Sequence, residues 1–560
     1  MERFISSALI KLTLSSAVTG IAAHQAFRRY EPTKKTLPLY ALTLFATTAC
    51  LSRACATSTT YQILFYITFF LSFVGSTISY RLSPSHPLAD IPGPVIFKVS
   101  NLWRAYLSWT GRQHLVLKAL HDEYGTVVRT GPNQISVIDV PSMKAVLGPG
   151  GLPKGQGYQV RRDERTDGSL LELVGDPHAA RRRIWNRGMS TESLREYEVI
   201  IARRANQLVD ALQAREKEEV DLGQWLVYFT IDFMADMAFG GVSGPKMLEN
   251  GGDSYGLLSL IEIAAKTSEV LTHIPWVTMI PGYQTVLAKN VQKMLDFGRE
   301  WSNSRVTTGA QTKDLWYHLT DEAGIEKTPP SRETVTSDSA LAIVAGSDTA
   351  ATAMTCLFWF LLANPKCYKR LQKEIDEVYP ADEDAFDTSK HARMKYLGAC
   401  INEALRLMPP VPTGGPRVVP QGSGGKHIAG HFLPEGTHVY VPAYCMHRRA
   451  HHFYPKTEEF VPERWLEDPD FNPTTNAPSA GSSSPDGLVY ESFIPFSYGP
   501  TSCVAKNLAR REIMMVMCLL LQRFQFRFAE GFESKTWLAQ VRDYFVALRA
   551  PLKVEITRRS

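Results

Sequence analysis

The chain has 560 residues, and its 61 Lys and Arg residues barely outnumber its 56 Asp and Glu residues. This mild basicity excludes the strongly cationic surface with which proteins bind nucleic acids, so we expect no nucleic-acid partner. The eight cysteines include no Cys-x-x-Cys pair and no framework spacing, which predicts reduced thiols in a cytosol-facing domain.

The first 80 residues are the most apolar part of the chain. Residues 57–80 form an uncharged run rich in Phe, Ile and Leu that is long enough to cross a bilayer. Residues 36–52 are uncharged but shorter, and residues 4–27 are largely apolar. We therefore predict a membrane-anchor region over residues 1–80 with two or three transmembrane helices. A cleaved signal peptide is the alternative for the first run, but its weak apolar core and the later runs argue against it.

Basic residues around these runs predict their orientation. Four lie between the first and second runs, only Arg53 lies between the second and third, and Arg81 follows the third. By the positive-inside rule, the loop at residues 28–35 and everything beyond Arg81 face the cytosol. Residues 81–95 contain four prolines and predict a stiff hinge, for which an ordinary linker is the alternative.

A basic helix is predicted at residues 176–187, after a helix at 114–124 and a hairpin with strands at 126–130 and 134–138. His178 and Arg182 are four residues apart, so they share one helical face and suit the edge of an anionic cofactor. A solvated basic helix and a docking face for an acidic partner are the alternatives. Helices at 198–214 and 222–239 and a broken apolar stretch at 261–279 follow.

A long helix is predicted from the N-cap residue Ser331 to residue 363, just before Asn364-Pro365. In its middle the sequence Ala-Gly-Ser-Asp-Thr ends with Asp348 and Thr349, polar side chains that are unusual inside a buried helix. A solvated stripe is the alternative, and the apolar residues on both sides argue against it.

Glu403 and Arg406 lie three residues apart in a helix predicted at 393–408, after another at 366–378. Such a pair is usually a weak surface ion pair. Strands are predicted at 413–419, which contains Arg417, and at 427–440 with a bend. Arg464 follows in the sequence Pro-Glu-Arg-Trp, and residues 466–490 read as a surface loop.

Near the C-terminus, residues 496–508 are predicted to form a loop that places Cys503 at the start of a helix. Gly499-Pro500 is a turn, and residues 504–523 carry apolar side chains at helical spacing without Pro or Gly. A thiol at a helix N-terminus faces unpaired N–H groups and the positive end of the helix dipole, which favour the metal-ligating thiolate. The alternative is that Cys503 is a small buried hydrophobe, as most cysteines are.

The pattern Phe-x-x-Gly-x-x-x-Cys-x-Ala from Phe496 to Ala505 resembles the haem-binding loop of the cytochrome P-450 superfamily, the haem-thiolate monooxygenases. The Asp-Thr helix, Glu-x-x-Arg and Pro-Glu-Arg-Trp precede it in that family's order. The proline-rich segment resembles the hinge of fungal membrane-bound members. This resemblance implies a mainly helical fold with small β-sheets over residues 96–560, in which haem b is sandwiched between the long distal helix and the proximal cysteine loop.

The resemblance also implies roles around the iron. Cys503 would be the axial ligand, Phe496 would shield the sulfur, and Gly499 would let the backbone approach the porphyrin. Two positions depart from the family pattern. Thr501 stands where an Arg normally contacts a haem propionate, and Ala505 stands where Gly is commoner. Haem retention must therefore depend on other cations.

Those cations are expected to be Arg182, on the same helical face as His178, and Arg417, which match the family's other propionate-binding positions. Asp348 and Thr349 match the acid–alcohol pair that relays protons to bound oxygen, next to a Gly-Ser step that opens a groove over the iron.

Three further residues match a buried network that locks the meander onto the core next to the cysteine loop. They are Glu403, Arg406 and Arg464.

By resemblance we expect a monooxygenase that inserts one oxygen atom from O2 into a C–H bond of a small lipophilic substrate of secondary metabolism. NADPH–cytochrome P-450 reductase would deliver electrons from NADPH, with cytochrome b5 as a second candidate partner. The endoplasmic reticulum membrane would hold the protein, with its catalytic domain facing the cytosol. A haem-thiolate isomerase or dehydratase acting on peroxides, and a non-catalytic membrane haem-binding protein, are the alternatives.

Overall fold

The computed structural model describes residues 2–29, 37–55, 59–159, 168–241, 244–280, 283–309, 312–383, 385–466 and 489–559. The chain separates into two compact units. Unit 1 comprises Met1–Asn101 and Arg129–Asn133, and unit 2 comprises Leu102–Val128 and Gln134–Ser560. The three-part division predicted at residues 1–80, 81–95 and 96–560 stays a prediction.

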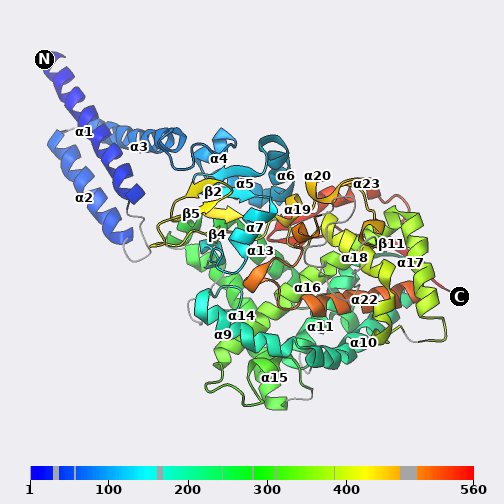
Figure 1. The fold of residues 1–560 in the computed structure, drawn as a ribbon. Helices are drawn as coiled ribbons and strands as arrows, with labels where there is room; N and C mark the ends of the chain where they lie inside the picture. The colour runs from blue at the N-terminus through cyan, green and yellow to red at the C-terminus, as the bar shows by residue number, and fades with distance from the viewer. Residues whose placement is uncertain are drawn as a thin grey trace. The chain divides into compact units, whose positions relative to one another are not determined.

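Unit 1 contains α1 (Glu2–Arg29), α2 (Leu37–Cys55), α3 (Thr59–Leu82) and α4 (Val95–Val99) (Figure 1). The three apolar runs are therefore helical, as predicted. The third helix continues two residues into the predicted hinge, where the Arg81 side chain donates a 2.6 Å hydrogen bond to the carbonyl oxygen of Val99.

Small residues let α1 approach α3 closely. The hydroxyl of Ser16 donates a 2.5 Å hydrogen bond to the carbonyl oxygen of Phe65. One turn later, a Cβ on Gly20 would lie 2.5 Å from the carbonyl oxygen of Phe69, so glycine is required for this contact. Close packing at small residues is the usual means by which helices associate in a bilayer.

Among the described helices, two are long and apolar enough to cross a membrane. One is α16 (Arg332–Ala363), most of which is buried inside unit 2 and which is therefore a core helix. The other is α3, whose side chains are mostly accessible. This helix fits a membrane anchor by its length and composition.

Unit 2 is mainly helical with small sheets, as expected. Its helices are α5 (Leu102–Thr110), α6 (Gln113–Tyr124), α7 (Val140–Leu147), α8 (Gln156–Gln159), α9 (Gly175–Gly188), α10 (Thr191–Gln213), α11 (Leu222–Phe239), α12 (Met247–Asn250), α13 (Leu257–His273), α14 (Tyr283–Thr308), α15 (Leu315–Leu319), α16, α17 (Pro365–Val378), α18 (Lys395–Leu407), α19 (Ala443–Met446), α20 (Ala450–Phe453), α21 (Glu463–Leu466), α22 (Lys506–Arg523) and α23 (Ser534–Trp537). Short 3-10 turns are η1 (Pro275–Met279), η2 (Thr388–Arg393), η3 (Tyr490–Ser492), η4 (Gly499–Thr501) and η5 (Leu538–Gln540).

The strands of the chain are short, and most of β1 belongs to unit 1. They are β1 (Val127–Gly131), β2 (Gln134–Val137), β3 (Glu219–Asp221), β4 (Arg417–Val418), β5 (Lys426–Ile428), β6 (His431–Leu433), β7 (His438–Tyr440), β8 (Phe524–Phe528), β9 (Arg542–Tyr544), β10 (Val546–Leu548) and β11 (Lys553–Arg558). Strand β7 pairs in parallel with β2 and antiparallel with β4. Strand β11 lies between β3 and β8, and two hairpins pair β5 with β6 and β9 with β10.

Helix α16 is the central element of unit 2. It packs against α11, α14, α18 and α22, and α10 packs in turn against α11 and α22 (Figure 1). The ends of α16 lie where the sequence predicts them. The side chain of Ser331 accepts a hydrogen bond from the backbone N–H of Thr334 at the start, and Asn364 ends the helix before Pro365.

Several predicted boundaries were wrong. Helix α10 begins at Thr191, seven residues earlier than predicted, because Ser190 caps it by accepting a hydrogen bond from the N–H of Ser193. The long strand predicted at 427–440 is instead the β5–β6 hairpin followed by β7, because the turn at Gly430 interrupts it. Most of the loop predicted at 466–490 lies outside the described residues.

Candidate active site

The cysteine loop is a series of tight turns between η3 and α22. The backbone N–H of Cys503 donates a 2.9 Å hydrogen bond to the carbonyl oxygen of Phe496, which closes the loop. Gly499 has a φ of 72°, and a Cβ at this position would lie 2.1 Å from the carbonyl oxygen of Leu147. The close approach that requires glycine here is therefore to the C-terminal end of α7.

Helix α22 begins at Lys506, not at the cysteine as predicted, because Cys503 and the two residues after it form a turn. Burial raises the pKa of the Cys503 thiol, while the backbone N–H of Ala505 and the cations Arg182 and Lys506 lower it by less. The backbone N–H and the two cations therefore favour the thiolate, as expected, but burial outweighs them. A metal ion bound to the sulfur would supply further stabilisation of the thiolate.

Cys503 is an exposed residue, although the surrounding protein raises the pKa of its thiol. Helix α16 also has accessible residues in its middle. Ala345 is exposed and Thr349 is half-buried, within a helix that is otherwise largely covered.

Helix α9 reaches the cysteine loop through Arg182. Its guanidinium group donates a 2.6 Å hydrogen bond to the carbonyl oxygen of Ser502 and a 3.0 Å bond to the side chain of Asn186. His178, one turn earlier, is buried. Burial and the charges of Lys154, Arg182 and Arg417 lower the pKa of His178 to about 4, so this imidazole is neutral at physiological pH.

Arg417 approaches the loop from β4. Its Nη2 atom donates a 2.7 Å hydrogen bond to the hydroxyl of Thr501, and its buried Nε atom has no hydrogen-bond partner in the structure. The Arg417 side chain therefore contacts Thr501, the residue that stands where the family normally has an Arg.

Lys154 completes this group of cations and was not predicted. Its ammonium group donates to the carbonyl oxygens of Leu170, Leu171 and Leu173 at 2.8–3.3 Å. Burial and the charges of Arg417 and Arg182 lower the pKa of Lys154 to about 7, with a weaker opposing effect of Glu172. Lys154 is the single charged residue in a Gly- and Pro-rich stretch, residues 148–155, and no sequence motif identifies it as part of the site.

In α16, Asp348 is buried, which excludes the solvated stripe considered for this residue. Burial raises the pKa of Asp348, against the lowering effect of Arg549, whose Nη1 atom lies 3.4 Å from Oδ1. The hydroxyl of Thr349 donates a 2.7 Å hydrogen bond to the carbonyl oxygen of Ala345. Asp348 and Thr349 are thus adjacent in sequence but have different partners.

The space left by Gly346 in the same segment is filled from α11. A Cβ at this position would lie 2.7 Å from the sulfur of Met234. Ser347 is buried and donates back to the carbonyl oxygen of Ile343. On the side that faces α11, the Gly-Ser step therefore serves helix packing, and the groove over the iron stays a prediction.

Glu403, Arg406 and Arg464 meet in a buried network. Both carboxylate oxygens of Glu403 accept 2.9 Å hydrogen bonds from Arg406, and Oε1 also accepts a 3.0 Å bond from Arg464. Trp465 donates its indole N–H to Oε2 at 3.0 Å. Burial alone would raise the pKa of Glu403, but the two guanidinium groups hold it below its usual range.

Arg406 extends this network to three backbone carbonyl oxygens, those of His447, Thr457 and Glu459. The network therefore fastens the segment before α21 to α18.

The family model for cytochrome P450 matches residues 91–556. The chain belongs to the cytochrome P450 family. Several of its curated relatives are fungal. The chain is 31% identical to the cytochrome P450 monooxygenase FCK2 of Fusarium pseudograminearum over 90% of this chain and 87% of that protein. It is 30% identical to cytochrome P450 67 of Uromyces fabae over 96% and 98%, and 28% identical to the tryprostatin B 6-hydroxylase of Aspergillus fumigatus over 88% and 84%.

This P450 is thus a haem-thiolate monooxygenase of the fungal type, an oxidoreductase that incorporates oxygen from O2. Its residues fit the haem that the family implies. Lys154, Arg182 and Arg417 concentrate positive charge beside the cysteine loop, with Glu172 as the acidic neighbour that acts on Lys154. The two propionate groups of a bound haem would supply negative charge, and the partnerless Nε of Arg417 would offer a donor to one of them.

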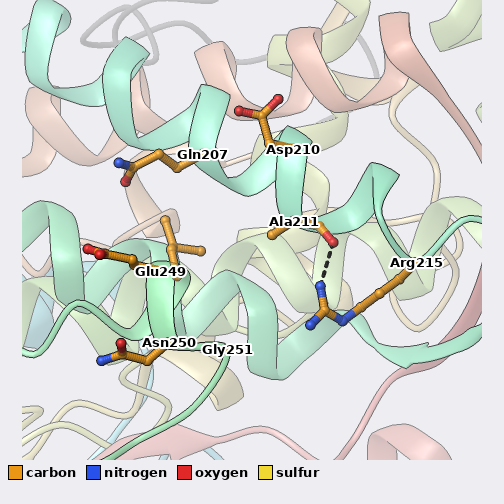
Figure 2. A pocket seen from close by; sticks show the side chains of 8 residues that line it. Gln207, Asp210, Ala211, Arg215, Glu249, Asn250 and Gly251 are labelled. Carbon is orange, nitrogen blue, oxygen red and sulfur yellow. Dashed lines mark hydrogen bonds between the residues drawn. The ribbon is translucent and has the colours of Figure 1, made fainter.

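A separate surface cavity of about 370 Å³ lies between α10 and α12 (Figure 2). In it, Arg215 donates a 2.8 Å hydrogen bond to the carbonyl oxygen of Ala211. The walls are mostly polar and contain none of the predicted site residues, so we assign it no part in the reaction. They include Gln207, Asp210, Glu249 and Asn250.

Proposed function

We propose that this P450 hydroxylates a small lipophilic molecule of fungal secondary metabolism. The observation that carries the proposal is the exposed residue Cys503, beside which lie the basic side chains of Arg182, Arg417 and Lys154. The names of two relatives, the tryprostatin B 6-hydroxylase and an averantin hydroxylase, describe hydroxylation of small organic molecules. Both names support a substrate of this chemical class.

In this proposal, haem b would be held between α16 and the cysteine loop, with Cys503 as the ligand to its iron and Phe496 shielding the sulfur. Arg417 and Arg182 would bind the propionates as cations. His178, being neutral, would contribute a hydrogen bond. Haem, when bound, supplies dioxygen activation, which thiolate ligation promotes by favouring O–O cleavage.

Asp348 and Thr349 hold and move protons on the distal side. Asp348 is suited to this because its pKa is set by two opposing influences, burial and Arg549. Thr349 is suited to passing protons because it is half-buried, one turn after the exposed residue Ala345 in the middle of α16. A hydroxyl group both accepts and donates, so it can pass a proton onward.

Electrons are proposed to come from NADPH through a cytochrome P-450 reductase, with cytochrome b5 as a second candidate donor. We propose that α1, α2 and α3 form an anchor over residues 1–80 in the endoplasmic reticulum membrane. Residues 81–95 would act as the hinge, and residues 96–560 would form the catalytic domain in the cytosol. The apolar, accessible surface of α3 supports membrane attachment.

Two other functions are less well supported. An isomerase or dehydratase fed with peroxides has no need of an acid–alcohol pair, and this chain carries one. A non-catalytic haem-binding protein has no need of this pair either. Consumption of NADPH and O2 with a reductase distinguishes the proposed monooxygenase from both.

Coexpression with a fungal reductase, followed by an untargeted comparison of metabolites, identifies the substrate and tests the proposal. We expect a product that is heavier than a host metabolite by one oxygen atom and absent with Cys503→Ser. In the purified system, Thr349→Ala should lower the yield of product per NADPH several-fold. Thr336→Ala removes the same kind of hydroxyl-to-backbone bond at the exposed start of α16 and serves as the control. Equal yields from all three proteins would contradict the role of Thr349.

A further inference from the structure

The cysteine loop lacks a charge at Thr501, the position where the family normally has an arginine that contacts a haem propionate. The hydroxyl of Thr501 accepts the 2.7 Å hydrogen bond from Arg417. A hydroxyl group carries no charge, so it cannot replace the charge-assisted bond of an arginine. A cation from another part of the chain would have to take over this role.

The backbone places Lys154 beside Arg417. Residues 153–155 run antiparallel to β4, with Lys154 directly opposite Arg417. Two backbone hydrogen bonds, of 2.9 and 3.0 Å, join the residues that flank this pair. Opposite residues of such a pair project their side chains to the same face, where they lie close together. Lys154 therefore shares the face from which Arg417 reaches Thr501.

The ammonium group of Lys154 is held in place by the turn at residues 169–173. It donates to three carbonyl oxygens of this turn at 2.8–3.3 Å. The turn is itself fixed to α16, because the carboxylate of Asp338 accepts a 2.8 Å hydrogen bond from the backbone N–H of Leu170. The charge of Lys154 thus stays next to α9, the helix that carries Arg182.

Most of the charges that face Lys154 are positive. The titratable or charged side chains around it are Arg417 of β4, Arg182 and His178 of α9, Glu172 of the turn and Tyr158 of α8. With burial, the two arginines lower the pKa of Lys154 to about 7, so the protein's own charges leave this lysine only partly protonated at neutral pH. Carboxylates bound beside these cations would favour the protonated form.

We propose that Lys154 is the cation that replaces the missing arginine at position 501, and that it holds the haem propionates through its positive charge, together with Arg417 and Arg182. The inference rests on the proposed position of haem between α16 and the cysteine loop. Its three N–H donors stay on the turn, so Lys154 acts as a charge fixed beside the propionates.

Haem binding is then linked to proton uptake by Lys154. Below about pH 7 this lysine is charged with or without haem, so haem affinity is highest there and does not depend on this residue's titration. Above about pH 7, haem binding must bring a proton onto the lysine. Haem affinity therefore falls as the pH rises, until the lysine of the haem-bound protein is neutral as well.

The test measures the equilibrium partition of haem between the full-length protein and a haem-free acceptor protein, from about pH 6 to pH 9. The ratio of the wild-type affinity to that of Lys154→Met cancels the contribution of the acceptor. We expect a ratio of about tenfold or more below pH 7 and a fall of up to about tenfold per pH unit above it. Lys426→Met is the matched control, because it removes a 2.9 Å bond from another lysine to the carbonyl oxygen of Gly150, and it should follow the wild type at every pH.

Two further variants separate charge from structure. Thr501→Arg in the Lys154→Met background returns an arginine to the family's position, so it should recover most of the affinity without the fall above pH 7. Glu172→Gln keeps Lys154 but removes the carboxylate that raises its pKa, so the fall should begin at a lower pH. This variant decides the question if Lys154→Met does not fold.

A ratio of wild type to Lys154→Met that does not change with pH would overturn this inference. So would a Lys154→Met/Thr501→Arg variant that binds haem no better than Lys154→Met, or an unshifted pH dependence in Glu172→Gln. The proposed position of haem survives such a result if Arg182→Gln still weakens haem binding. If neither Arg182→Gln nor Lys154→Met changes haem binding, the proposed position fails, and the inference fails with it.

Discussion

The guanidinium group of Arg182 donates a 2.6 Å hydrogen bond to the carbonyl oxygen of Ser502, the residue before Cys503. This bond ties α9 to the cysteine loop across more than 300 residues of sequence. It also brings a positive charge close enough to lower the pKa of the thiol. One side chain thus positions the loop and stabilises the charge that the sulfur must carry as a ligand.

Arg182→Gln should weaken haem binding for two reasons. It removes the charge-assisted hydrogen bond from Arg182 to the carbonyl oxygen of Ser502, worth on the order of 2 kcal/mol, and it raises the pKa of Cys503. The measurement is the rate of haem transfer to an excess of a haem-free acceptor protein, which should rise by about tenfold or more. Arg183→Gln, which removes the exposed neighbouring arginine, is the control and should change nothing. Equal rates for the two variants would contradict the role of Arg182.

Gly499→Ala should prevent the cysteine loop from closing, because the new methyl group meets the carbonyl oxygen of Leu147 at 2.1 Å. Gly324 has a similar positive φ of 67° with nothing within 4 Å, so Gly324→Ala carries the backbone strain without the clash. We expect the first variant to lose most of its bound haem and the second to keep it. Haem content per protein after purification is the measurement, and full haem in Gly499→Ala would contradict the packing described here.

Glu403→Gln should cost about 3–5 kcal/mol of unfolding free energy, because it leaves Arg406 and Arg464 as buried charges without a counter-ion. Glu463→Gln breaks the exposed pair with Arg370, which is worth about 1 kcal/mol or less. Denaturant unfolding of both variants measures the difference. Similar midpoints for the two would show that the buried network adds no more than a surface pair does.

Acid should destabilise this P450 well before its carboxylates titrate. Burial lowers the pKa of His121 to about 4, whereas an unfolded histidine titrates near 6.5. The unfolded state therefore takes up a proton first, so stability is fully present above about pH 6.5 and is lost as the pH falls toward 4. For this one residue the loss is on the order of 3 kcal/mol.

His121→Gln should flatten the fall of unfolding free energy between about pH 6.5 and pH 4 while lowering stability at neutral pH. The second effect arises because the imidazole bonds to the carbonyl oxygen of Gly125 and the hydroxyl of Ser136. Denaturant unfolding across this pH range checks both effects. An unchanged slope would show that His121 does not contribute to acid unfolding.

Local signals predicted the helices best. Helix α11 spans the predicted residues 222–239, because Asp221 caps its start and Gly240 ends it with a left-handed φ of 76°. Ser331 and Pro365 mark α16 in the same way. The start of α22 was misplaced because Val504 and Ala505 fit a helical pattern but belong to the turn that follows the cysteine.

Contacts between distant segments were harder to predict. The family pattern named Glu403, Arg406 and Arg464 as a set, and the structure brings them together. No pattern marked Lys154 or Arg549. Each acts on residues far along the chain, and only the folded structure shows which residues those are. The structure also shows a contact of Gly499 that no pattern predicted, the close approach of its backbone to the end of α7, while its approach to the porphyrin stays a prediction.

The ferrous carbon monoxide difference spectrum of the purified full-length protein tests thiolate ligation by Cys503 most directly. We expect the wild type to show the strongly red-shifted Soret band of a thiolate-ligated haem. Cys503→Ser should lose that band while Cys518→Ser, at a buried cysteine in α22, keeps it. An unaltered spectrum in Cys503→Ser would contradict the assignment of this sulfur as the iron ligand.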